Sequence, residues 1–563
     1  MFQFVRNHVL PNWKSIIVVL APLLLLPLPL SRMKEAECGY VILIMAIFWM
    51  TEALPLPVTS LIPVVALPLF GIMETSDVST AYMKDTNMMF IGGLILALAI
   101  QFCNLHKRAA LAVLLLVGAK PRWLLAGFMG TTAFLSMWIS NTATTAMMVP
   151  IVDAVAAELY KEDDVEMVRS HSQSTVATNS GSVEELVPSE SIETERQLAA
   201  VEKEKRRKVR AGIMISTSYS SVIGGTGSLI GSSPQLALKG IVQETFGATE
   251  MNFASWMAFT LPGMLINLLF TWIWLQVIFI GLWRETDGGR DKEVIKVIRQ
   301  KFKDLGPMTF HEIAVLVLFI LCVALWFFRD PGFMPGWAQL FGNAEKVDDA
   351  TAAMLIVVLL FIIPAKPSFR CQEEQPETDR GAHKLSPALL DWKYVQERLP
   401  WGVILLLGGG YALSDATKKS GLSNWIGVQL AGMVVLPPFL IMLVVCVITA
   451  TITEVASNTA VANIFLPILA DTAIAIRINP LYFMIPVTAT CSYAFMLPVS
   501  TPPNAIAFSA AKMKPNEMMK AGWFIKLVCV FVICVTMETW GNVVFGSKHF
   551  PEWANVTAIA SRT

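Results

Sequence analysis

Charged residues are scarce in this sequence of 563 residues. Asp, Glu, Lys and Arg make up 15% of it, whereas about a quarter is usual in a soluble chain. Hydrophobic residues make up 55%, and the mean hydropathy is +0.58. The apolar residues fall in blocks close to the roughly 20 residues with which a helix crosses a bilayer. The scarcity of charge and the lengths of these blocks predict an all-α polytopic membrane protein.

Several kinds of functional group are also missing. With 43 basic and 43 acidic residues the formal net charge is zero, so no nucleic-acid partner is expected. The eight cysteines form no CxxC pair and have no His-linked spacing, which gives no support for a zinc site. The six histidines form no cluster and there is no HExxH motif, which argues against an intramembrane hydrolase. We therefore expect a protein that is not an enzyme.

A cleavable signal peptide is not expected. Residues 16–30 are apolar, but Arg32, Lys34 and Glu35 follow in place of a small-residue cleavage site. Residues 1–38 are therefore predicted to be a retained N-terminal anchor helix.

The apolar blocks predict about eleven transmembrane helices. They lie at residues 15–31, 39–54, 56–73, 86–103, 210–240, 254–282, 310–328, 350–365, 400–414, 482–510 and 521–546. Two further apolar segments, 123–156 and 436–470, carry polar residues at mid-length. These two are predicted to enter the membrane and return as re-entrant hairpins.

The basic connections predict the orientation. Segment 161–210 holds nine Lys and Arg residues and segment 283–308 holds seven, so the positive-inside rule places both in the cytoplasm. Within the first, residues 170–195 are rich in Ser, Thr and Glu and are expected to be disordered. An odd number of crossings puts the N-terminus inside and the C-terminus outside. The sequon at Asn555 is then a glycosylation site on the outer side of the plasma membrane.

The sequence contains an internal repeat. Ser140-Asn141-Thr142-Ala143 recurs as Ser457-Asn458-Thr459-Ala460, at a sequence offset of 317, and Gly92-Gly93 and Pro150-Ile151 recur at the same offset. Downstream, Pro234 matches Pro503 at an offset of 269, and the difference of 48 is close to the length of the polar 161–210 segment. The predicted crossings place the two copies in opposite directions across the membrane.

This repeat predicts an inverted duplication. The boundaries are a first repeat at 39–282 that includes the cytoplasmic loop 161–210, a cytoplasmic linker at 283–308, a second repeat at 309–546 and an extracellular tail at 547–563. Secondary transporters with inverted repeats bind substrate near mid-membrane, where helices are broken.

The repeated polar triplets are the candidate binding site. Ser, Asn and Thr in an apolar segment can simply join helices or bond to backbone carbonyls, but their duplication in inverted halves favours binding. Their oxygens suit a small hard cation and their N–H and O–H groups suit an anion. The Gly-rich stretch 222–236 and the Pro-rich stretch 494–506 predict broken helices that line the same cavity. Glu52 and Glu454 are either buried acids with a role or acids at span ends.

Taken together, these motifs closely resemble the divalent anion:sodium symporter family. The resemblance runs through nearly the whole chain outside 161–210, including "KDTNMMFIGGL", "NLHKR", "FLSMWISNTATTAMMVPI", "TEVASNTA" and "FMLPVSTPPNAI". Short stretches such as "GLWR" and "VANIFLPI" look most like the insect Indy-type members. The "NLHKR" stretch (104–108) is expected at the cytoplasmic surface.

The resemblance implies a homodimer whose scaffold and transport parts move as an elevator. Carried over to this sequence, the substrate-binding residues would be Ser140, Asn141, Thr142, Ser233, Ser457, Asn458, Thr459 and Thr501. Sodium would be bound by Ser140, Asn141, Thr226, Gly231, Ser457, Asn458, Thr501 and Pro502. The implied function is sodium-coupled transport of di- and tricarboxylates such as succinate and citrate.

One stretch departs from the family pattern. Carboxylate carriers of the family usually have Asn where this chain has Gln235, and Ser233 resembles sulfate-type members. A sulfate carrier and a sodium-independent carboxylate exchanger therefore remain alternatives. Both triplets are complete, including Thr142 and Thr459, which favours sodium coupling.

Overall fold

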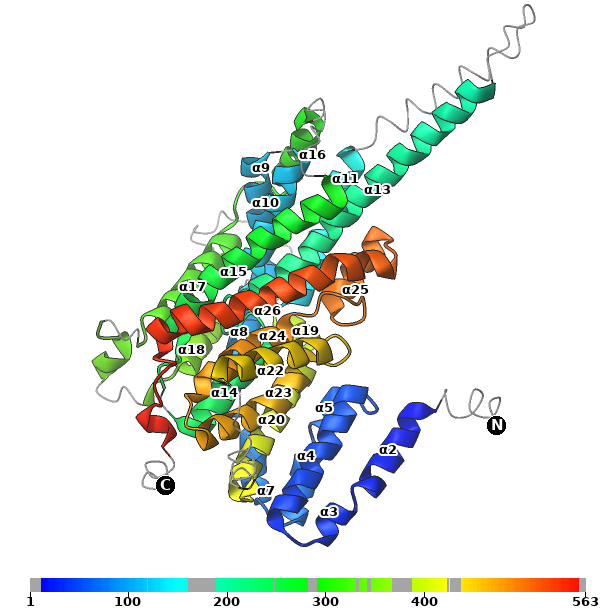
Figure 1. Ribbon diagram of the computed structural model, residues 1–563. Helices are drawn as coiled ribbons and strands as arrows, with labels where there is room; N and C mark the ends of the chain where they lie inside the picture. The colour runs from blue at the N-terminus through cyan, green and yellow to red at the C-terminus, as the bar shows by residue number, and fades with distance from the viewer. Residues whose placement is uncertain are drawn as a thin grey trace, which may run out of the picture.

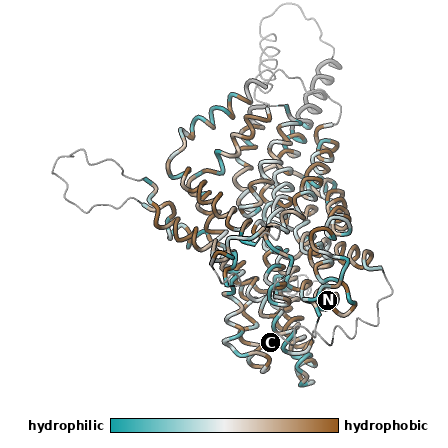
Figure 2. The backbone as a smooth tube through the Cα atoms, turned by 90° about the vertical axis from the view of Figure 1, so that its left-hand side faces the viewer, coloured by the Kyte–Doolittle hydropathy of each residue, from teal (hydrophilic) through white to brown (hydrophobic). Residues whose placement is uncertain are grey.

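The fold is helical throughout the part of the chain that the structure describes. A computed structural model describes residues 12–118, 120–159, 189–247, 249–281, 291–330, 334–341, 346–366, 387–422, 425 and 437–555. Within these ranges the only β pairing is an isolated bridge between Pro364 and Ala388. Long, roughly parallel and antiparallel helices form one elongated bundle (Figure 1). Hydrophobic residues run along most of these helices (Figure 2).

The N-terminal half begins with short helices and ends with long ones. Its elements are α2 (Trp13–Leu24), α3 (Pro27–Leu30), α4 (Lys34–Thr51), α5 (Leu56–Thr59), α6 (Ile62–Leu69), α7 (Thr75–Ala81), α8 (Asp85–Phe102), α9 (Leu105–Val117), α10 (Pro121–Ser136), α11 (Asn141–Leu159), α13 (Ser189–Gly225), α14 (Ser233–Phe246), α15 (Phe253–Leu275) and the π-helical turn η2 (Gln276–Ile280).

The C-terminal half has a similar series of helices. Its elements are α16 (Asp291–Asp304), α17 (Phe310–Phe327), η4 (Trp337–Phe341), α18 (Asp349–Ile362), α19 (Trp392–Arg398), α20 (Trp401–Lys419), α22 (Pro438–Ile452), α23 (Asn458–Ala475), α24 (Pro480–Ser492), α25 (Pro502–Ala511), α26 (Pro515–Phe545) and η6 (Glu552–Ala554). Many of these helices start with proline in the first turn, where the missing N–H would have no helical partner in any case.

Corresponding helices start at matched positions in the two halves. Helices α10 and α22 both start with proline, and α11 and α23 both start with asparagine, each pair at the sequence offset of 317. The starts of α14 and α25 are related by the offset of 269. The two offsets found in the sequence therefore also describe where the helices begin.

The number of helices that could cross a membrane alone is smaller than predicted. In the described ranges six helical segments are long and apolar enough: Trp13–Leu30, Thr75–Phe102, Phe253–Ile280, Phe310–Phe327, Asn458–Ala475 and Pro515–Phe545. The bent pair α19–α20, with an angle of 63°, makes a seventh. Other expected crossings consist of shorter or broken helices, such as α5–α6, α18 and α24–α25. The count of eleven crossings stays a prediction.

The expectation of disorder at 170–195 is wrong for its last residues. Residues 160–188 lie outside the described ranges, but α13 starts at Ser189 and runs without interruption to Gly225. The physical reason is cooperativity, because a helix nucleated by a buried segment extends into polar sequence at little cost. The polar N-terminal end of α13 projects from the bundle at the same end as α16 (Figure 1).

The arginine of "NLHKR" is buried between helices, while the location of this stretch at the cytoplasmic surface stays a prediction. The Arg108 side chain is buried, and its Nε lies 2.9 Å from Glu312 Oε1 on α17. Its terminal nitrogens donate to the backbone carbonyls of Leu305, Gly306 and Pro307. Arg108 therefore joins α9 to the start of α17.

Candidate functional site

The first triplet forms the turn between α10 and α11. Asn141 is the first residue of α11, while Ser140 and Thr142 are exposed on either side of it. The Ser136 hydroxyl donates to Asn141 Oδ1 over 2.7 Å, and Ser140 Oγ accepts from the Ala143 N–H over 3.4 Å. The three residues of the triplet thus lie together at a helix N-terminus, where backbone N–H groups attract anions.

The second triplet forms the turn between α22 and α23 in the same way. Ser457 precedes α23 and Asn458 begins it. The Thr453 hydroxyl donates to Asn458 Oδ1 over 2.7 Å, the same distance as in the first turn. Thr459 is buried, whereas Thr142 is exposed. The two turns therefore have the same hydroxyl–asparagine contact but differ in the solvent exposure of their threonine.

Ser136 and Thr453 are further candidate site residues that the sequence analysis missed. Each hydroxyl lies five residues before the asparagine whose amide oxygen it contacts. The two residues are related by the offset of 317, so the repeat extended by a few residues could have identified them. In each turn the hydroxyl and amide oxygens, 2.7 Å apart, could contact one cation together.

Not every hydroxyl of the first turn belongs to the site. Thr145 is buried, and its hydroxyl donates to Ser221 on α13 over 2.9 Å. Thr144 is also buried, against the interior of the bundle. These two threonines therefore pack α11 against its neighbours.

The first break in a helix lies between α13 and α14. Within it, Ser228 Oγ donates to the backbone carbonyl of Met137 in the first turn. A Cβ at Gly225 would lie 2.2 Å from Asn141 Oδ1, and one at Gly231 would lie 2.5 Å from the Gly225 carbonyl oxygen. Only glycine allows these approaches. The break and the first turn are therefore in direct contact.

The second break lies between α24 and α25 and contacts the second turn. Glu454 is buried, and its two carboxylate oxygens accept from the N–H groups of Phe495, Met496 and Leu497 over 3.0–3.2 Å. Its Oε1 also lies 3.2 Å from Lys526 Nζ on α26. Glu454 is therefore a buried acid that fastens the unwound backbone. Glu52, by contrast, is exposed at the end of α4.

The helices after the two breaks start with the same backbone geometry. Ser232 precedes α14 with φ −149° and ψ 148°, and Thr501 precedes α25 with φ −145° and ψ 149°. Ser232 Oγ lies 3.4 Å from Ser492 Oγ at the end of α24. Ser233 is half-buried and Pro502 is exposed. Thr501 is buried, and its hydroxyl has no partner in the described part of the chain, so it is free for a ligand.

Gln235 and Asn504 occupy matched positions but bond differently. Asn504 Nδ2 donates to the Ala494 carbonyl over 2.9 Å and to Ser500 Oγ over 2.9 Å, and its Oδ1 accepts from Ser218. Gln235 is fully buried, yet neither amide atom has a partner among the described residues. At the offset of 269, Ser500 corresponds to Gly231, which has no hydroxyl. Likewise Ser218 corresponds to Val487, which also has none. Gln235 therefore lacks the hydroxyl partners that Asn504 has.

Thr226 is placed apart from the first turn. Its hydroxyl donates to the Ile223 carbonyl over 2.7 Å at the end of α13. Its carbonyl accepts from Trp256 Nε1 on α15, and the residue lines a small cavity with Asn267 and Tyr493. The structure thus brings Gly231 to the turn but directs Thr226 elsewhere.

The two halves pack crosswise around these segments. Helix α14 of the first half packs against α23 and α24 of the second, and α25 of the second half packs against α11 and α13 of the first. Ser218 on α13 donates to Asn504 on α25. This packing brings both turns and both breaks together inside the helical bundle.

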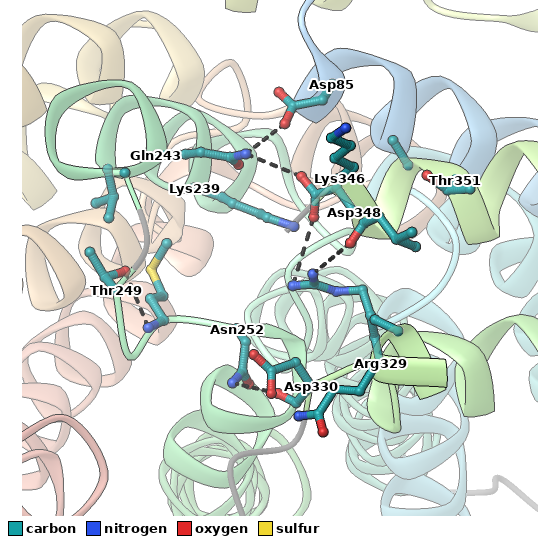
Figure 3. A pocket seen from close by; sticks show the side chains of 17 residues that line it. Asp85, Lys239, Gln243, Thr249, Asn252, Arg329, Asp330, Lys346, Asp348 and Thr351 are labelled. Carbon is teal, nitrogen blue, oxygen red and sulfur yellow. Dashed lines mark hydrogen bonds and ion pairs between the residues drawn. The ribbon is translucent and has the colours of Figure 1, made fainter. Parts of the chain in front are cut away.

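A cavity lined by Lys239, Arg329 and Asp348 contains none of the predicted site residues. It has a volume of about 700 Å³ and lies between the end of α14 and the start of α8 and α18. Lys239, Arg329 and Asp348 are among its lining side chains (Figure 3). Asp349 is buried beside it and pairs with Lys239 and with Arg329 Nε, the latter over 2.6 Å. Burial would raise the pKa of Asp348, but chiefly the charge of Lys239 lowers it. We assign this cluster to fastening α14 to α17 and α18.

The sequence matches the family described as the sodium:sulfate symporter transmembrane region over residues 10–547. It is 42% identical to the Na(+)/citrate cotransporter of Rattus norvegicus over 98% of this chain and 99% of the relative. It is 43% identical to the Na(+)/dicarboxylate cotransporter 3 of Rattus norvegicus, over 97% of this chain and 94% of that one. The Drosophila melanogaster protein I'm not dead yet is 40% identical, over 99% and 93%.

The chain therefore belongs to the divalent anion:sodium symporter family and is a multi-pass membrane transporter. The identity to the fly protein is no higher than the identities to the two mammalian proteins. The likeness to the fly protein extends over nearly the whole chain, at an identity close to those of the mammalian relatives.

Proposed function

We propose that this protein carries di- and tricarboxylates, such as succinate and citrate, across the plasma membrane together with sodium. The observation that carries the proposal is the matched pair of turns, in which Ser136–Asn141 and Thr453–Asn458 present the same oxygen pair. The names of the similar proteins, which specify citrate or dicarboxylate and sodium, support the same substrates.

In this proposal each turn binds part of a cation–anion pair. Asn141 and Asn458 amide oxygens, with the backbone oxygens of the adjacent break, hold sodium. The exposed hydroxyls of Ser140 and Thr142, together with Ser457, Thr459, Ser233 and Thr501, donate to substrate carboxylates. Bound sodium offsets the charge of the anion, which would otherwise be costly inside the membrane. Gln235 lies next to this site and supplies a free amide for selecting among anions.

The transport cycle in this proposal is alternating access by an elevator movement in a homodimer. The two halves form an inverted repeat, at 39–282 and 309–546, with re-entrant hairpins at α10–α11 and α22–α23. The crosswise packing of α14 and α25 supports a shared mobile unit that contains both turns. Coupling requires that the empty and fully loaded forms cross readily, because a ligand shifts a conformational equilibrium only through unequal affinity for the two states.

Uptake of labelled succinate, citrate and sulfate into cells, each with sodium or with choline, tests the function. We expect sodium-dependent uptake of succinate and citrate and little uptake of sulfate. Succinate uptake that is unchanged in choline would instead indicate a carboxylate exchanger. A preference for sulfate would indicate a sulfate carrier, and Ser233 would then be the first residue to substitute.

A further inference from the structure

A second, separate cavity with four polar lining residues lies beside the two breaks. It has a volume of about 10 Å³, and its polar lining side chains are Thr226, Thr260, Asn267 and Tyr493. A volume of this size holds one water-sized particle. Asn267 is 2% exposed, and its Oδ1 has no partner in the described part of the chain. A buried amide oxygen without a partner is costly, which indicates that something fills the cavity.

Both threonine hydroxyls of the cavity already donate to backbone carbonyls. Thr226 Oγ donates to the Ile223 carbonyl over 2.7 Å, and Thr260 Oγ donates to the Trp256 carbonyl over 2.9 Å. Asn267 Nδ2 points to the Tyr493 hydroxyl at 3.5 Å. The two threonine oxygens and Asn267 Oδ1 therefore have lone pairs available for a ligand in the cavity. Three such oxygens from neighbouring side chains favour a cation.

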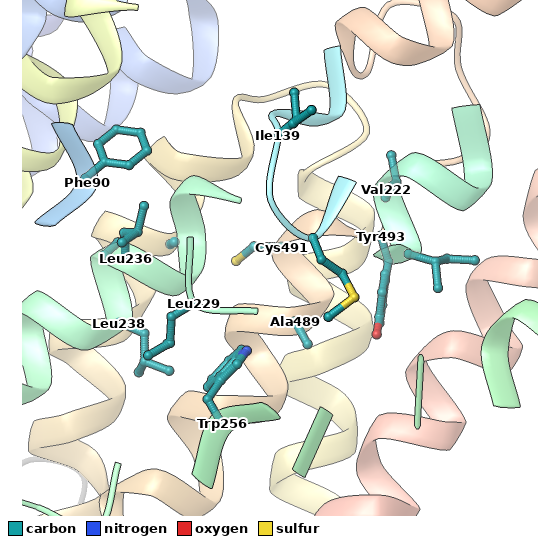
Figure 4. Close-up of a cluster of buried hydrophobic side chains, with 14 of the residues drawn as sticks. Phe90, Ile139, Val222, Leu229, Leu236, Leu238, Trp256, Ala489, Cys491 and Tyr493 are labelled. Atoms are coloured by element: carbon teal, nitrogen blue, oxygen red, sulfur yellow. The ribbon is translucent and has the colours of Figure 1, made fainter. Parts of the chain in front are cut away.

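Two helix ends also converge here. Helix α13 ends at Gly225, directly before Thr226, and α24 ends at Ser492, directly before Tyr493. A helix C-terminus carries a partial negative charge of about half an elementary charge. Side chains from both halves meet in this region, and Figure 4 shows Trp256, Ala489 and Tyr493 in one cluster of buried side chains. The cavity therefore has a favourable potential for a cation without any carboxylate among its lining residues.

We propose that this cavity is a sodium-sized cation site, additional to the oxygen pairs at the two turns, with Asn267 Oδ1 as its central ligand. The proposal rests on the proposed sodium symport. Because Thr226 and Tyr493 begin the two breaks, a cation here would hold both breaks in one arrangement. It would thus couple sodium binding to the geometry of both turns.

The test measures the sodium dependence of succinate uptake in Asn267→Ala and Thr260→Val. Loss of one oxygen ligand is expected to raise the sodium concentration for half-maximal uptake about tenfold, as for an interaction of hydrogen-bond strength, and to make the activation curve less steep. Thr271→Val is the matched control. Thr271 is also on α15, buried and without a hydroxyl partner among the described residues, but it does not line the cavity. Its sodium curve should match the wild type.

Asn267→Asp keeps the oxygen and adds a carboxylate, so it should shift half-activation to lower sodium concentration. Unchanged sodium curves in all three cavity variants, with only the maximal rate altered, would show that the cavity holds a structural water and overturn the proposal. Variants that do not transport are tested by a thermal-shift assay of the purified protein without substrate. The assay compares the melting temperature in sodium with that in potassium. We expect sodium to stabilise Asn267→Ala less than Thr271→Val. Equal stabilisation of the two variants would overturn the proposed cation site. Sodium-independent uptake by the wild type would contradict the symport proposal instead, and the thermal assay would still report on the cavity.

Discussion

At the scale of single residues, Asn141 and Asn458 are the centre of the candidate site. Each begins a helix, and each amide oxygen is paired with a hydroxyl five residues earlier at 2.7 Å. The side-chain amide also has two N–H donors. One residue can therefore face a cation through its oxygen and an anion through its nitrogen.

Replacing either asparagine should abolish transport. We expect Asn141→Ala and Asn458→Ala to reach the cell surface and to take up no succinate, because each loses a cation ligand and an anion donor together. Thr144→Val is the control, since Thr144 lies three residues after Asn141 but is buried away from the turn. Surface labelling measures how much of each variant reaches the cell surface, and labelled succinate measures uptake. Normal uptake by either alanine variant would remove these residues from the site.

A second residue-scale prediction concerns the buried pair of Glu454 and Lys526. Removing one partner of such a pair leaves an uncompensated charge and costs about 3–5 kcal/mol. Glu454→Gln keeps an oxygen for the backbone N–H groups but strands the Lys526 ammonium, so the apparent melting temperature in detergent should fall. The double variant Glu454→Gln/Lys526→Met should recover part of the loss. No recovery would mean that the carboxylate acts through the backbone alone.

At the scale of elements, the two broken helices decide the shape of the site. Unwound backbone inside a membrane protein must be satisfied by protein groups. The first break is fastened by Ser228 and by glycine contacts to the turn, and the second is fastened by Glu454 and Asn504. The same architecture is thus held by different side chains in the two halves.

The close approach of the first break predicts that Gly225→Ala fails. A Cβ there would lie 2.2 Å from Asn141 Oδ1, which must displace the amide from its place in the turn. We expect succinate uptake to fall at least about tenfold, the effect of about 1.4 kcal/mol on binding. Gly130→Ala on α10 is the control, because a Cβ there meets nothing within 4 Å and alanine favours a helix. Equal succinate uptake by the two variants would contradict the close contact between Gly225 and Asn141.

At the scale of the whole molecule, two polar helical segments lie at one end (Figure 1). Helix α16 and the polar end of α13 lie at the top of the view, while the C-terminus lies at the lower left (Figure 1). The positive-inside rule assigns the basic end to the cytoplasm. On this assignment we expect the exposed Asn555 on the opposite, outer side.

This orientation predicts that Asn555 carries a glycan. Treatment of the expressed protein with an N-glycosidase should lower its apparent mass, and Asn555→Gln should already have the lower mass. Succinate uptake by this variant should be near normal, since Asn555 belongs to neither turn and to neither break. A mass that the enzyme does not change would argue for a cytoplasmic C-terminus.

Much of the site could be read from the sequence because its signals are local or periodic. The triplets, the Gly-rich and Pro-rich breaks and the offsets of 317 and 269 all place helix starts, such as those of α11 and α23, where the structure has them. The helical continuation of α13 through residues 189–210 was missed, because polar composition alone does not reveal that a buried segment extends as a helix.

The sequence by itself determined the class of protein, the repeated motifs and the two polar turns, because hydropathy, motifs and helix breakers are properties of neighbouring residues. Only the tertiary structure decided which groups meet across the chain. The pairing of Glu454 with Lys526, the burial of Arg108 and the turning of Thr226 toward Asn267 depend on packing between distant helices. Such partners are set by the free energy of burying polar groups, which must find a partner wherever the fold places them.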